Sequence, residues 1–307
     1  MRYIWLLSLA GCFDVGLYDP WRPIHEAEVD RIRRVDRYVE RLTHPSAQVR
    51  DEAFRGLVGM GPEAVEPLLT AATYGDAPRA SAALLVLEAR REPGLAPTLV
   101  LRWPKMIGAA NRAATADLLG RSGDASVVPD LARFLDLDAS ALVRSRLCAA
   151  LGILGGAHGI DALGRAARDP AALVSLPAIR ALGQVGRSEA AGPLLDAWRR
   201  HGDAPRRLAC ADAFGRLRAR SAVEDLIAGL DSDSHEVRAA CASALGLIAD
   251  RRAVRRLVDA LGDPSIEVFQ EADRALRRIT GRTPAVVPGP RETLRERTKK
   301  AWEKILG

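Results

Sequence analysis

The sequence predicts an all-α protein, a right-handed α-solenoid of about eight helix pairs. Side chains of one kind recur about every 31 residues along the chain, which is typical of repeat architectures. Within each recurrence the apolar residues have the spacing of one helix face. Hydrophobic residues make up 48% of the 307 residues but aromatic residues only 5%. That composition disfavours a β-sandwich, which is rich in β-branched and aromatic residues, and a disordered chain, which is poor in apolar ones.

Eight positions, which we call the markers, set the phase of the repeat. They are separated by 29 to 33 residues and are Arg50, Arg79, Arg112, Arg144, Ser175, Arg207, Arg238 and Phe269. Three residues after each marker stands a mostly small side chain, and seven residues after it stands a large apolar one. Offsets of three, four and seven lie on one face of a helix. Each marker therefore opens a helix that buries one stripe.

A glycine recurs eight residues after five successive markers. These residues are Gly120, Gly152, Gly183, Gly215 and Gly246. Glycine in a helix costs about 1 kcal/mol relative to alanine. Its recurrence near the end of the second helix of each pair predicts that a neighbouring backbone passes close by.

Apolar residues at helical spacing also precede each marker and predict the first helix of each pair. A short polar turn joins the two helices, and aspartate recurs there at Asp76, Asp169, Asp203, Asp233 and Asp263. Such a carboxylate can accept hydrogen bonds from the free amides of the following helix and can pair with a marker arginine. We therefore interpret the arginine ladder as structural rather than as a binding stripe; its members are Arg50, Arg112, Arg144, Arg207 and Arg238.

The unit resembles a HEAT repeat, close to the bacterial HEAT-like variety also seen in phycobilin lyase subunits. The resemblance is visible in residues 236–246 and 253–261 and covers about residues 29–281. It implies a solenoid whose second helices line a concave surface that binds another protein. Repeats two and three depart from the pattern, because Pro93-Gly94 and Trp103-Pro104 are expected to interrupt their helices.

The end of the chain is expected to cover the last repeat, because a solenoid needs a polar cap. Residues 282–290 are rich in proline and predict a loop. Residues 291–307 predict an amphipathic capping helix whose apolar residues cover the last repeat; these are Leu294, Trp302, Ile305 and Leu306.

The first residues resemble a bacterial lipoprotein signal peptide. Arg2 precedes an apolar stretch over residues 4–9, and Leu9-Ala10-Gly11-Cys12 resembles a lipobox. We expect a signal peptide over 1–11, lipidation of Cys12, a tether over 12–28 and a location in the cell envelope. Phe13, which is not the aspartate that retains lipoproteins at the inner membrane, favours the outer membrane. A short buried N-terminal helix of a cytoplasmic scaffold is the alternative.

The residues that carry chemistry do not form a catalytic, cofactor or metal-binding motif. Deoxyhypusine hydroxylase, a di-iron HEAT-repeat enzyme, resembles this chain in architecture and holds its metal with His-Glu pairs in several repeats. Here His235-Glu236 has no second pair at the matching positions of other repeats. We expect His235 to be an exposed turn residue and the other histidines to lie in turns or in the tether: His25, His44, His158 and His201. An enzyme or enzyme subunit of the HEAT-like lyase or hydroxylase class remains the alternative.

The charge and the cysteines limit which classes of partner and ligand are expected. The net charge is +6, yet no run of consecutive basic residues exceeds a pair, so nucleic acid is not an expected partner. Cys148, Cys210 and Cys241 fall at small core positions and show no zinc-binding spacing. The sequence therefore predicts a lipid-anchored scaffold that binds an envelope protein, without catalysis or cofactor of its own.

Overall fold

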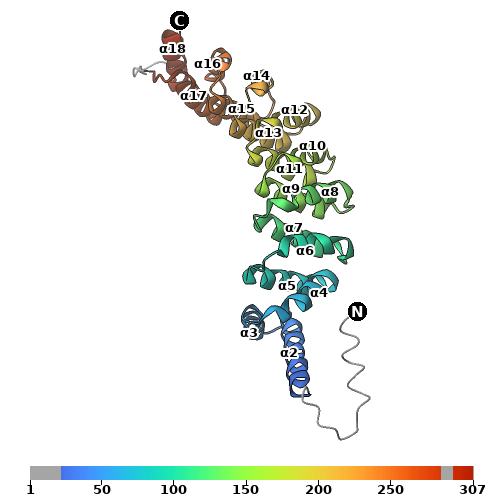
Figure 1. The fold of residues 1–307 in the computed structure, drawn as a ribbon. Coiled ribbons are helices and arrows are strands. Elements are labelled where there is room, and N and C mark those ends of the chain that lie inside the picture. Colours follow the sequence, from blue (N-terminus) through green and yellow to red (C-terminus); the bar gives the residue numbers. More distant parts are fainter. Residues whose placement is uncertain (1–21, 285–292, 307) are drawn as a thin grey trace.

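The computed structural model describes residues 22–284 and 293–306, so Cys12 and the expected signal peptide lie outside the described residues. Within this part the chain is all-α, with no strand, and stacks into one curved array (Figure 1). This confirms the predicted fold class. None of the described helices is long and apolar enough to cross a bilayer.

Eight helix pairs follow one another along the stack, as expected. The first helices are α2 (Arg22–Arg41), α4 (Val65–Tyr74), α6 (Leu95–Arg102), α8 (Val128–Leu137), α10 (His158–Ala166), α12 (Ala191–Arg200), α14 (Val223–Gly229) and α16 (Val254–Ala260). The second helices are α3 (Ala47–Val58), α5 (Ala77–Arg90), α7 (Ala109–Arg121), α9 (Ala141–Leu154), α11 (Ala172–Val185), α13 (Ala204–Leu217), α15 (His235–Ile248) and α17 (Ile266–Thr280). The last helix is α18 (Leu294–Leu306).

Three local expectations about helix bounds and phase are corrected. Helix α2 begins at Arg22 rather than near residue 29, because Pro23 suits the first turn of a helix, where its missing N–H has no partner to lose. Residues 93–94 and 103–104 flank helix α6 instead of interrupting it, with Gly94 at a left-handed φ of 69°. The marker of the second pair is Ala80 and not Arg79. Asp76 caps the N–H of Arg79, whereas the same cap in the sixth pair falls on Arg206, the residue before the marker Arg207.

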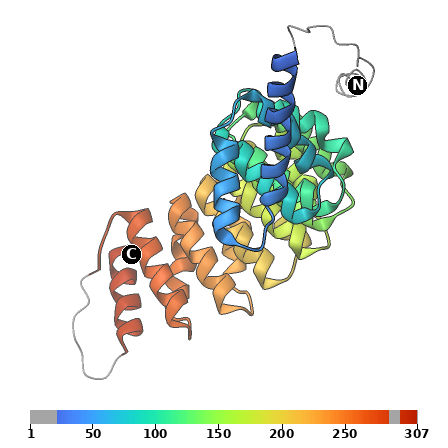
Figure 2. The same ribbon diagram turned by 90° about the horizontal axis from the view of Figure 1, so that it is seen from below.

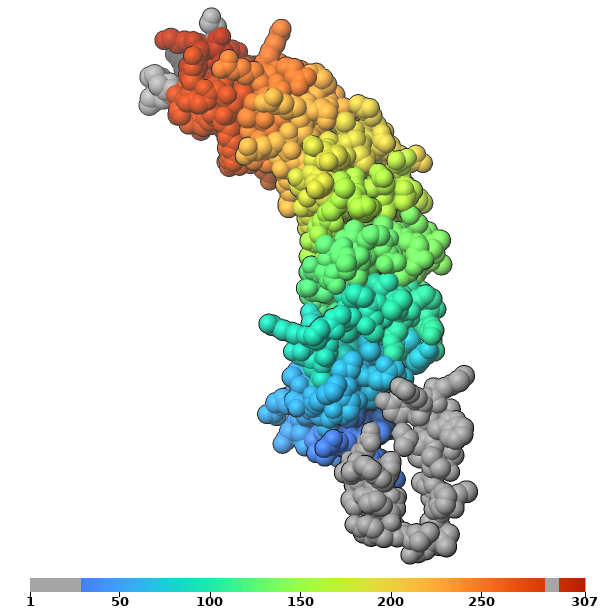
Figure 3. All heavy atoms as spheres, viewed as in Figure 1, coloured from blue at the N-terminus to red at the C-terminus, as the bar shows by residue number. Residues whose placement is uncertain are grey.

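The stack bends toward its second helices, which lie on the concave side in Figure 1. Figure 3 shows the same bend of the whole stack in space-filling form. Second helices of neighbouring pairs pack closely, while first helices are spread apart. The recurring glycines explain the close packing. A β-carbon on Gly246 would lie 2.8 Å from the Cα of Ala275, and one on Gly120 would lie 2.8 Å from the Cα of Ala150. Seen from below, the last repeats also swing away from the first ones, so the stack twists as it bends (Figure 2).

The same contact recurs at each of the five glycines, so the predicted close approach of a neighbouring backbone is confirmed. The pairs are Gly120–Ala150, Gly152–Ala181, Gly183–Ala213, Gly215–Ala244 and Gly246–Ala275. In each pair the alanine stands two residues before the glycine position of its own helix. The same short segment of a second helix therefore contacts the preceding helix through its alanine and the following helix through its glycine position.

Buried cysteine and tryptophan fill the space between the helices. Cys148, Cys210 and Cys241 are fully buried free thiols, which confirms their prediction as core residues. Burial raises the pKa of each thiol to about 12. Trp103 stacks on the ring of Phe134 at a centroid distance of 4.6 Å, which holds the end of α6 against α8.

Helix α18 covers the last pair with a narrower face than expected. Trp302 is fully buried, and its Nε1 donates to Oδ1 of Asp273 on α17 at 2.8 Å. Ile305 packs against the core as predicted, but Leu294 and Leu306 are 56% and 39% exposed. The expectation is wrong for these two leucines because they are the first and last residues of α18, where few neighbours surround a side chain.

Candidate functional site

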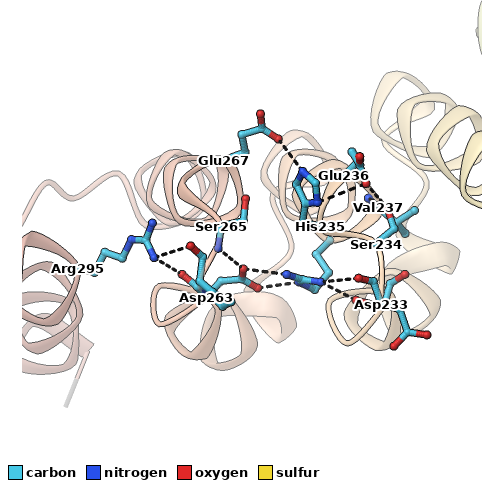
Figure 4. A network of polar contacts seen from close by, with 12 residues as sticks. Asp233, Ser234, His235, Glu236, Val237, Asp263, Ser265, Glu267 and Arg295 are labelled. Atoms are coloured by element: carbon cyan, nitrogen blue, oxygen red, sulfur yellow. Dashed lines mark hydrogen bonds and ion pairs between the residues drawn. The ribbon is translucent and has the colours of Figure 1, made fainter.

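The marker arginines bind the turn that precedes their own helix and, in three repeats, the turn of the next repeat. Nη1 of Arg238 donates to the carbonyls of Ser232 at 2.8 Å and Asp233 at 3.2 Å. Its Nε and Nη2 form a fork on the carboxylate of Asp263 at 2.7 and 3.0 Å. Figure 4 shows Asp263 at the centre of this network. Arg238 therefore ties two successive turns together.

Arg144 and Arg112 make the same two kinds of contact. Arg144 donates to the carbonyls of its own turn at 3.0 and 3.1 Å and to Asp169 at 2.9 Å. Arg112 forms the fork on Asp138 with a shortest distance of 2.6 Å. These carboxylates are mostly buried, so the pairs are charge-assisted bonds in a partly dry setting.

The other two members of the arginine ladder make no such fork. Arg50 donates to the carbonyls of His44 and Pro45, each at 2.8 Å. Arg207 donates to the carbonyl of His201 at 3.2 Å, and its guanidinium lies 5.3 Å above the ring of Trp198. The structure thus places all five arginines at the turns that join the two helices of a pair, each bound to backbone carbonyls, and in three cases to a carboxylate of the next repeat's turn.

Three repeats lack an arginine marker, and a side chain from the following element serves their turn instead. Asn111 donates to the carbonyl of Gly75 at 2.8 Å, and Arg206 donates to that of Pro170 at 2.7 Å. Arg295 of α18 donates to that of Pro264 at 2.9 Å. Each acceptor lies five residues before its marker position. In the repeats without a marker arginine, a side chain from the next element therefore takes its place as donor to the turn.

The sequence carries a signal for this substitution, which the periodic pattern of apolar residues does not reveal. The residue directly before the marker is polar where the preceding repeat lacks arginine, as Asn111 and Arg206 show. Where the predecessor has the arginine, it is valine in four repeats, at Val143, Val174, Val237 and Val268, and the exception is Arg79 in the second repeat. The row of arginines is therefore explained by the needs of the turns.

His235 lies at the first residue of α15 between two carboxylates. Its Nδ1 is 3.6 Å from Oε2 of Glu236, and its Nε2 is 3.8 Å from Oε2 of Glu267 on the next pair (Figure 4). All three side chains are about half exposed. Over residues 22–284 and 293–306, no group of three or more His, Cys, Asp or Glu side chains has an arrangement that could hold a metal ion.

The expectation that every histidine is a solvated turn residue is wrong for His201. Its side chain is only 9% exposed, and its Nε2 lies 2.9 Å from the carbonyl oxygen of Ala167 in the preceding repeat. His201 follows α12 and bonds the end of α10, so it joins two first helices that otherwise have few contacts. His44 and His158 are exposed, and the side chain of His25 lies outside the described residues.

The concave surface is formed by the face of each second helix that points away from the core. On each helix this face consists of the residue two positions before the marker and the residues one, two, five and nine positions after it. In the middle repeats the part of this face nearest the marker is mostly apolar. Leu142 of α9 and Leu173 of α11 are 41% and 55% exposed. Beside them lie the partly exposed Leu176, Leu208, Ala209, Ala239 and Ala240. We call these seven residues the apolar band; it crosses α9, α11, α13 and α15.

Charged side chains border the apolar band. Arg146 pairs with Asp117 of the preceding repeat at 3.6 Å, and Arg216 pairs with Asp212 on its own helix at 2.9 Å. An apolar centre with a polar rim is the usual anatomy of a protein–protein interface. The contact residues cannot be named from the sequence, because the exposed stripe becomes recognisable only when the buried positions of each helix are known.

Comparisons with known proteins describe the same repeats. The family model for HEAT repeats matches residues 109–183, 138–215, 160–245 and 223–300, which together extend from 109 to 300. The matches start after the departures noted in the second and third pairs. The sequence has no significant match among the curated proteins.

Solved structures with a similar stack include two with a TM-score above 0.5. The Escherichia coli protein YibA is 14% identical with a TM-score of 0.52, over 87% of this chain and 100% of that one. Kap121p bound to Pho4p is 14% identical with a TM-score of 0.55, over 91% of this chain and 35% of that one. Human deoxyhypusine hydroxylase is 22% identical with a TM-score of 0.37, over 83% of this chain and 99% of that one. At these identities the likeness concerns the fold alone.

Proposed function

Because this chain belongs to the HEAT-repeat family, we propose that it is a scaffold that binds another protein along its concave surface. The observation that carries the proposal is the apolar band, in which Leu142 and Leu173 expose much of their side chains on a surface of rigid helices. Burying apolar surface contributes about 25 cal/mol per Å² of favourable free energy. A preformed surface also loses little conformational entropy on binding.

The pattern of exposure supports a protein partner more than a small-molecule ligand. The apolar band extends over four successive second helices, and its centre consists of alanine and leucine. Small ligands favour concave pockets that enclose most of their surface, whereas proteins bind extended apolar patches. Kap121p bound to Pho4p is a protein-bound stack of the same fold.

The proposal includes a lipid anchor at Cys12, in the envelope of a bacterium and at the outer membrane rather than the inner one. The lipobox resemblance of residues 9–12 and the presence of Phe13 after the cysteine support it. Stable anchoring takes two acyl chains or more, since a single chain binds membranes only reversibly. Labelling cells with radioactive palmitate tests it: the wild type should incorporate label and Cys12→Ala should not. Equal labelling of both proteins would contradict the anchor.

An enzyme or enzyme subunit of the lyase or hydroxylase class is the competing proposal. It requires a bound metal or pigment to supply chemistry that the side chains on this surface lack. Elemental analysis and the visible spectrum of the purified full chain distinguish the two proposals. Metal or pigment at one equivalent per chain would favour the enzyme.

Site-specific photo-crosslinking in cells tests the scaffold. Benzoylphenylalanine in place of Leu173 lies on the concave surface, and the same residue in place of Leu101 lies on the first helix α6, where the leucine is 79% exposed. We expect a discrete crosslinked protein from position 173 and none from position 101. The same products from both positions would contradict a concave binding surface.

A further inference from the structure

An open hollow of about 500 Å³ lies where the carboxyl ends of α13, α15 and α17 meet. Arg218, Arg220 and Arg278 line it, and all three side chains are exposed. Leu247 contributes an apolar wall and is 39% exposed. Leu247 and Arg278 each stand nine residues after their marker, so the hollow continues the row that forms the concave surface.

Close packing of the second helices creates this space. Gly246 lines the hollow and has no side chain to fill it, because its α-carbon faces Ala275 at a distance that excludes a β-carbon. Ala249 is the other small lining residue. The hollow is therefore a consequence of how the repeats stack, whereas the three arginines around it are not required by the stacking.

Neighbouring arginines form ion pairs with carboxylates, whereas among the arginines of the hollow only Arg220 has a carboxylate interaction within the described residues, a longer-range attraction to Asp250. Arg216 pairs with Asp212 at 2.9 Å, Arg252 with Asp250 at 3.0 Å and Arg277 with Asp273 at 2.8 Å. In the part of the chain that the structure describes, Arg218, Arg220 and Arg278 form no ion pair. Three guanidinium groups around one hollow produce a positive potential that attracts an anionic ligand.

The backbone at the hollow follows a helix C-cap that several repeats share. Arg218 has a φ of 50°, in the left-handed region where a β-carbon is strained. The fourth and fifth pairs place Gly155 and Gly186 at the same position, eleven residues after the marker, with φ of 70° and 71°. Ala249 holds this position in the seventh pair at a φ of 59° and also lines the hollow. Arg91 holds this position in the second pair at a φ of 52°, so the left-handed residue is the C-cap of the second helices and sets where Arg218 leaves α13.

We infer that this arginine hollow, made by Arg218, Arg220, Arg278 and Leu247, binds an acidic segment of the partner protein. Carboxylates of the segment lie against the guanidinium groups, and an apolar side chain of the segment packs on Leu247. The inference rests on the proposed function and names the chemistry of the partner. A peptide fits better than a phosphate ion, because the hollow is large, open, partly apolar and spread over three repeats.

Fluorescence anisotropy with a defined probe tests the inference. The probe is a synthetic fluorescent peptide in which glutamate alternates with leucine, titrated with the full chain. We expect binding at low salt that weakens as salt is raised. The triple variant R218Q/R220Q/R278Q should bind on the order of tenfold more weakly. The control R34Q/R200Q/R255Q removes the same charge from exposed arginines elsewhere and should bind within about twofold of wild type.

Two further measurements separate lost binding from unfolding and distinguish an acidic peptide from other anionic ligands. Arg218→Gly suits the left-handed backbone, so it should fold with an unchanged or higher Tm and still bind the probe more weakly, which separates lost binding from unfolding. Inorganic phosphate and a single-stranded oligonucleotide serve as competitors. An equal loss of binding in both triple variants, or displacement of the probe by either competitor at the probe's own concentration, would overturn the inference.

Crosslinking from position 173 separates this inference from the proposed function. If the triple variant is still crosslinked in cells as efficiently as wild type, the concave surface binds its partner without the arginine hollow, and the inference is wrong. If wild type binds the probe but gives no crosslinked protein, the inference on the hollow's chemistry stands and the scaffold proposal fails.

Discussion

Arg295 lies over the ring of Phe269, with its guanidinium carbon 5.9 Å from the ring centroid, and donates to the carbonyls of the last interhelix turn. Phe269 holds the marker position where Arg238 stands in the preceding repeat. The last turn has no ninth pair to supply a donor, so the capping helix α18 supplies it. The cap therefore completes the hydrogen bonds of the stack as well as its apolar surface.

Removal of Arg295 should loosen the last repeat. Arg295→Ala removes the donor to the carbonyls of Asp263 and Pro264, which costs about 0.5–1.5 kcal/mol for partly exposed bonds. We expect faster amide hydrogen exchange in α17 and α18, with little change in α7 and α9, because repeat stacks unfold locally. Lys304→Ala, at an exposed position of α18, is the control. Unchanged exchange in α17 would show that the turn does not depend on Arg295.

An arginine at position 175, the marker of the fifth repeat, should replace Arg206 as the donor to the turn at Pro170. Arg206→Val removes the donor to Pro170 and the bond to the hydroxyl of Ser175, so it should destabilise the stack by about 1–3 kcal/mol. Adding Ser175→Arg restores an arginine at the marker, with valine before the next marker as in other repeats. The double variant should recover most of the loss in denaturant unfolding. Simple additivity of the two single effects would contradict the substitution rule.

The ion pair between Arg238 and Asp263 should make the free energy of unfolding depend on pH. Burial raises the pKa of Asp263, but the hydrogen bonds from Arg238 and from the N–H of Ser265 outweigh it and hold the pKa below the ordinary 3.8. A carboxylate with a lowered pKa stabilises the fold above its ordinary pKa, and this contribution is lost as the pH falls through the lowered value.

Denaturant unfolding at neutral pH and at roughly pH 3 measures this dependence. Asp263→Asn should be less stable than wild type at neutral pH, and the difference should shrink in acid. Asp259→Asn, at an exposed carboxylate of α16, provides a comparison. A difference between Asp263→Asn and wild type that stays constant with pH would exclude the proposed role of the charge.

A methyl group at Gly183 should separate two second helices. Its β-carbon would lie 2.8 Å from that of Ala213 and 3.0 Å from the Cα, which is closer than such atoms approach. Gly183→Ala should therefore destabilise by about 1–3 kcal/mol, despite the higher helix propensity of alanine. Gly192→Ala on α12 meets nothing within 4 Å and should be neutral or slightly stabilising. Equal effects of the two substitutions on thermal unfolding would contradict the close-packing argument.

Prediction from sequence succeeded where one repeat could be compared with seven others. The eight pairs, the buried cysteines and the close approach at Gly152 or Gly246 all follow from recurrence, because each repeat has to bury the same stripe against the same kind of neighbour. It failed where a residue has no counterpart. His201 bonds Ala167 across the stack, and Leu294 and Leu306 end a helix outside the repeat.

The apolar band and the arginine hollow could not be assigned for a related reason. Leu173 and Arg278 are ordinary residues for a helix surface, and their spacing alone does not distinguish a solvated face from a binding face. Only the burial of the remaining positions identifies the exposed stripe. In the second pair the marker is Ala80, one residue later than expected at Arg79. Only the cap from Asp76 to the N–H of Arg79 identifies this position, because the repeat departs from the sequence pattern.

The sequence by itself determined the architecture, because a periodic pattern of small and large apolar side chains can be buried in only one way, by stacking pair on pair. Tertiary structure alone decided which surface is concave, which turn carbonyls need a donor from the next element, and where three unpaired arginines meet. Those properties depend on distances between residues about 30 or more positions apart, set by how closely the neighbouring backbones pack.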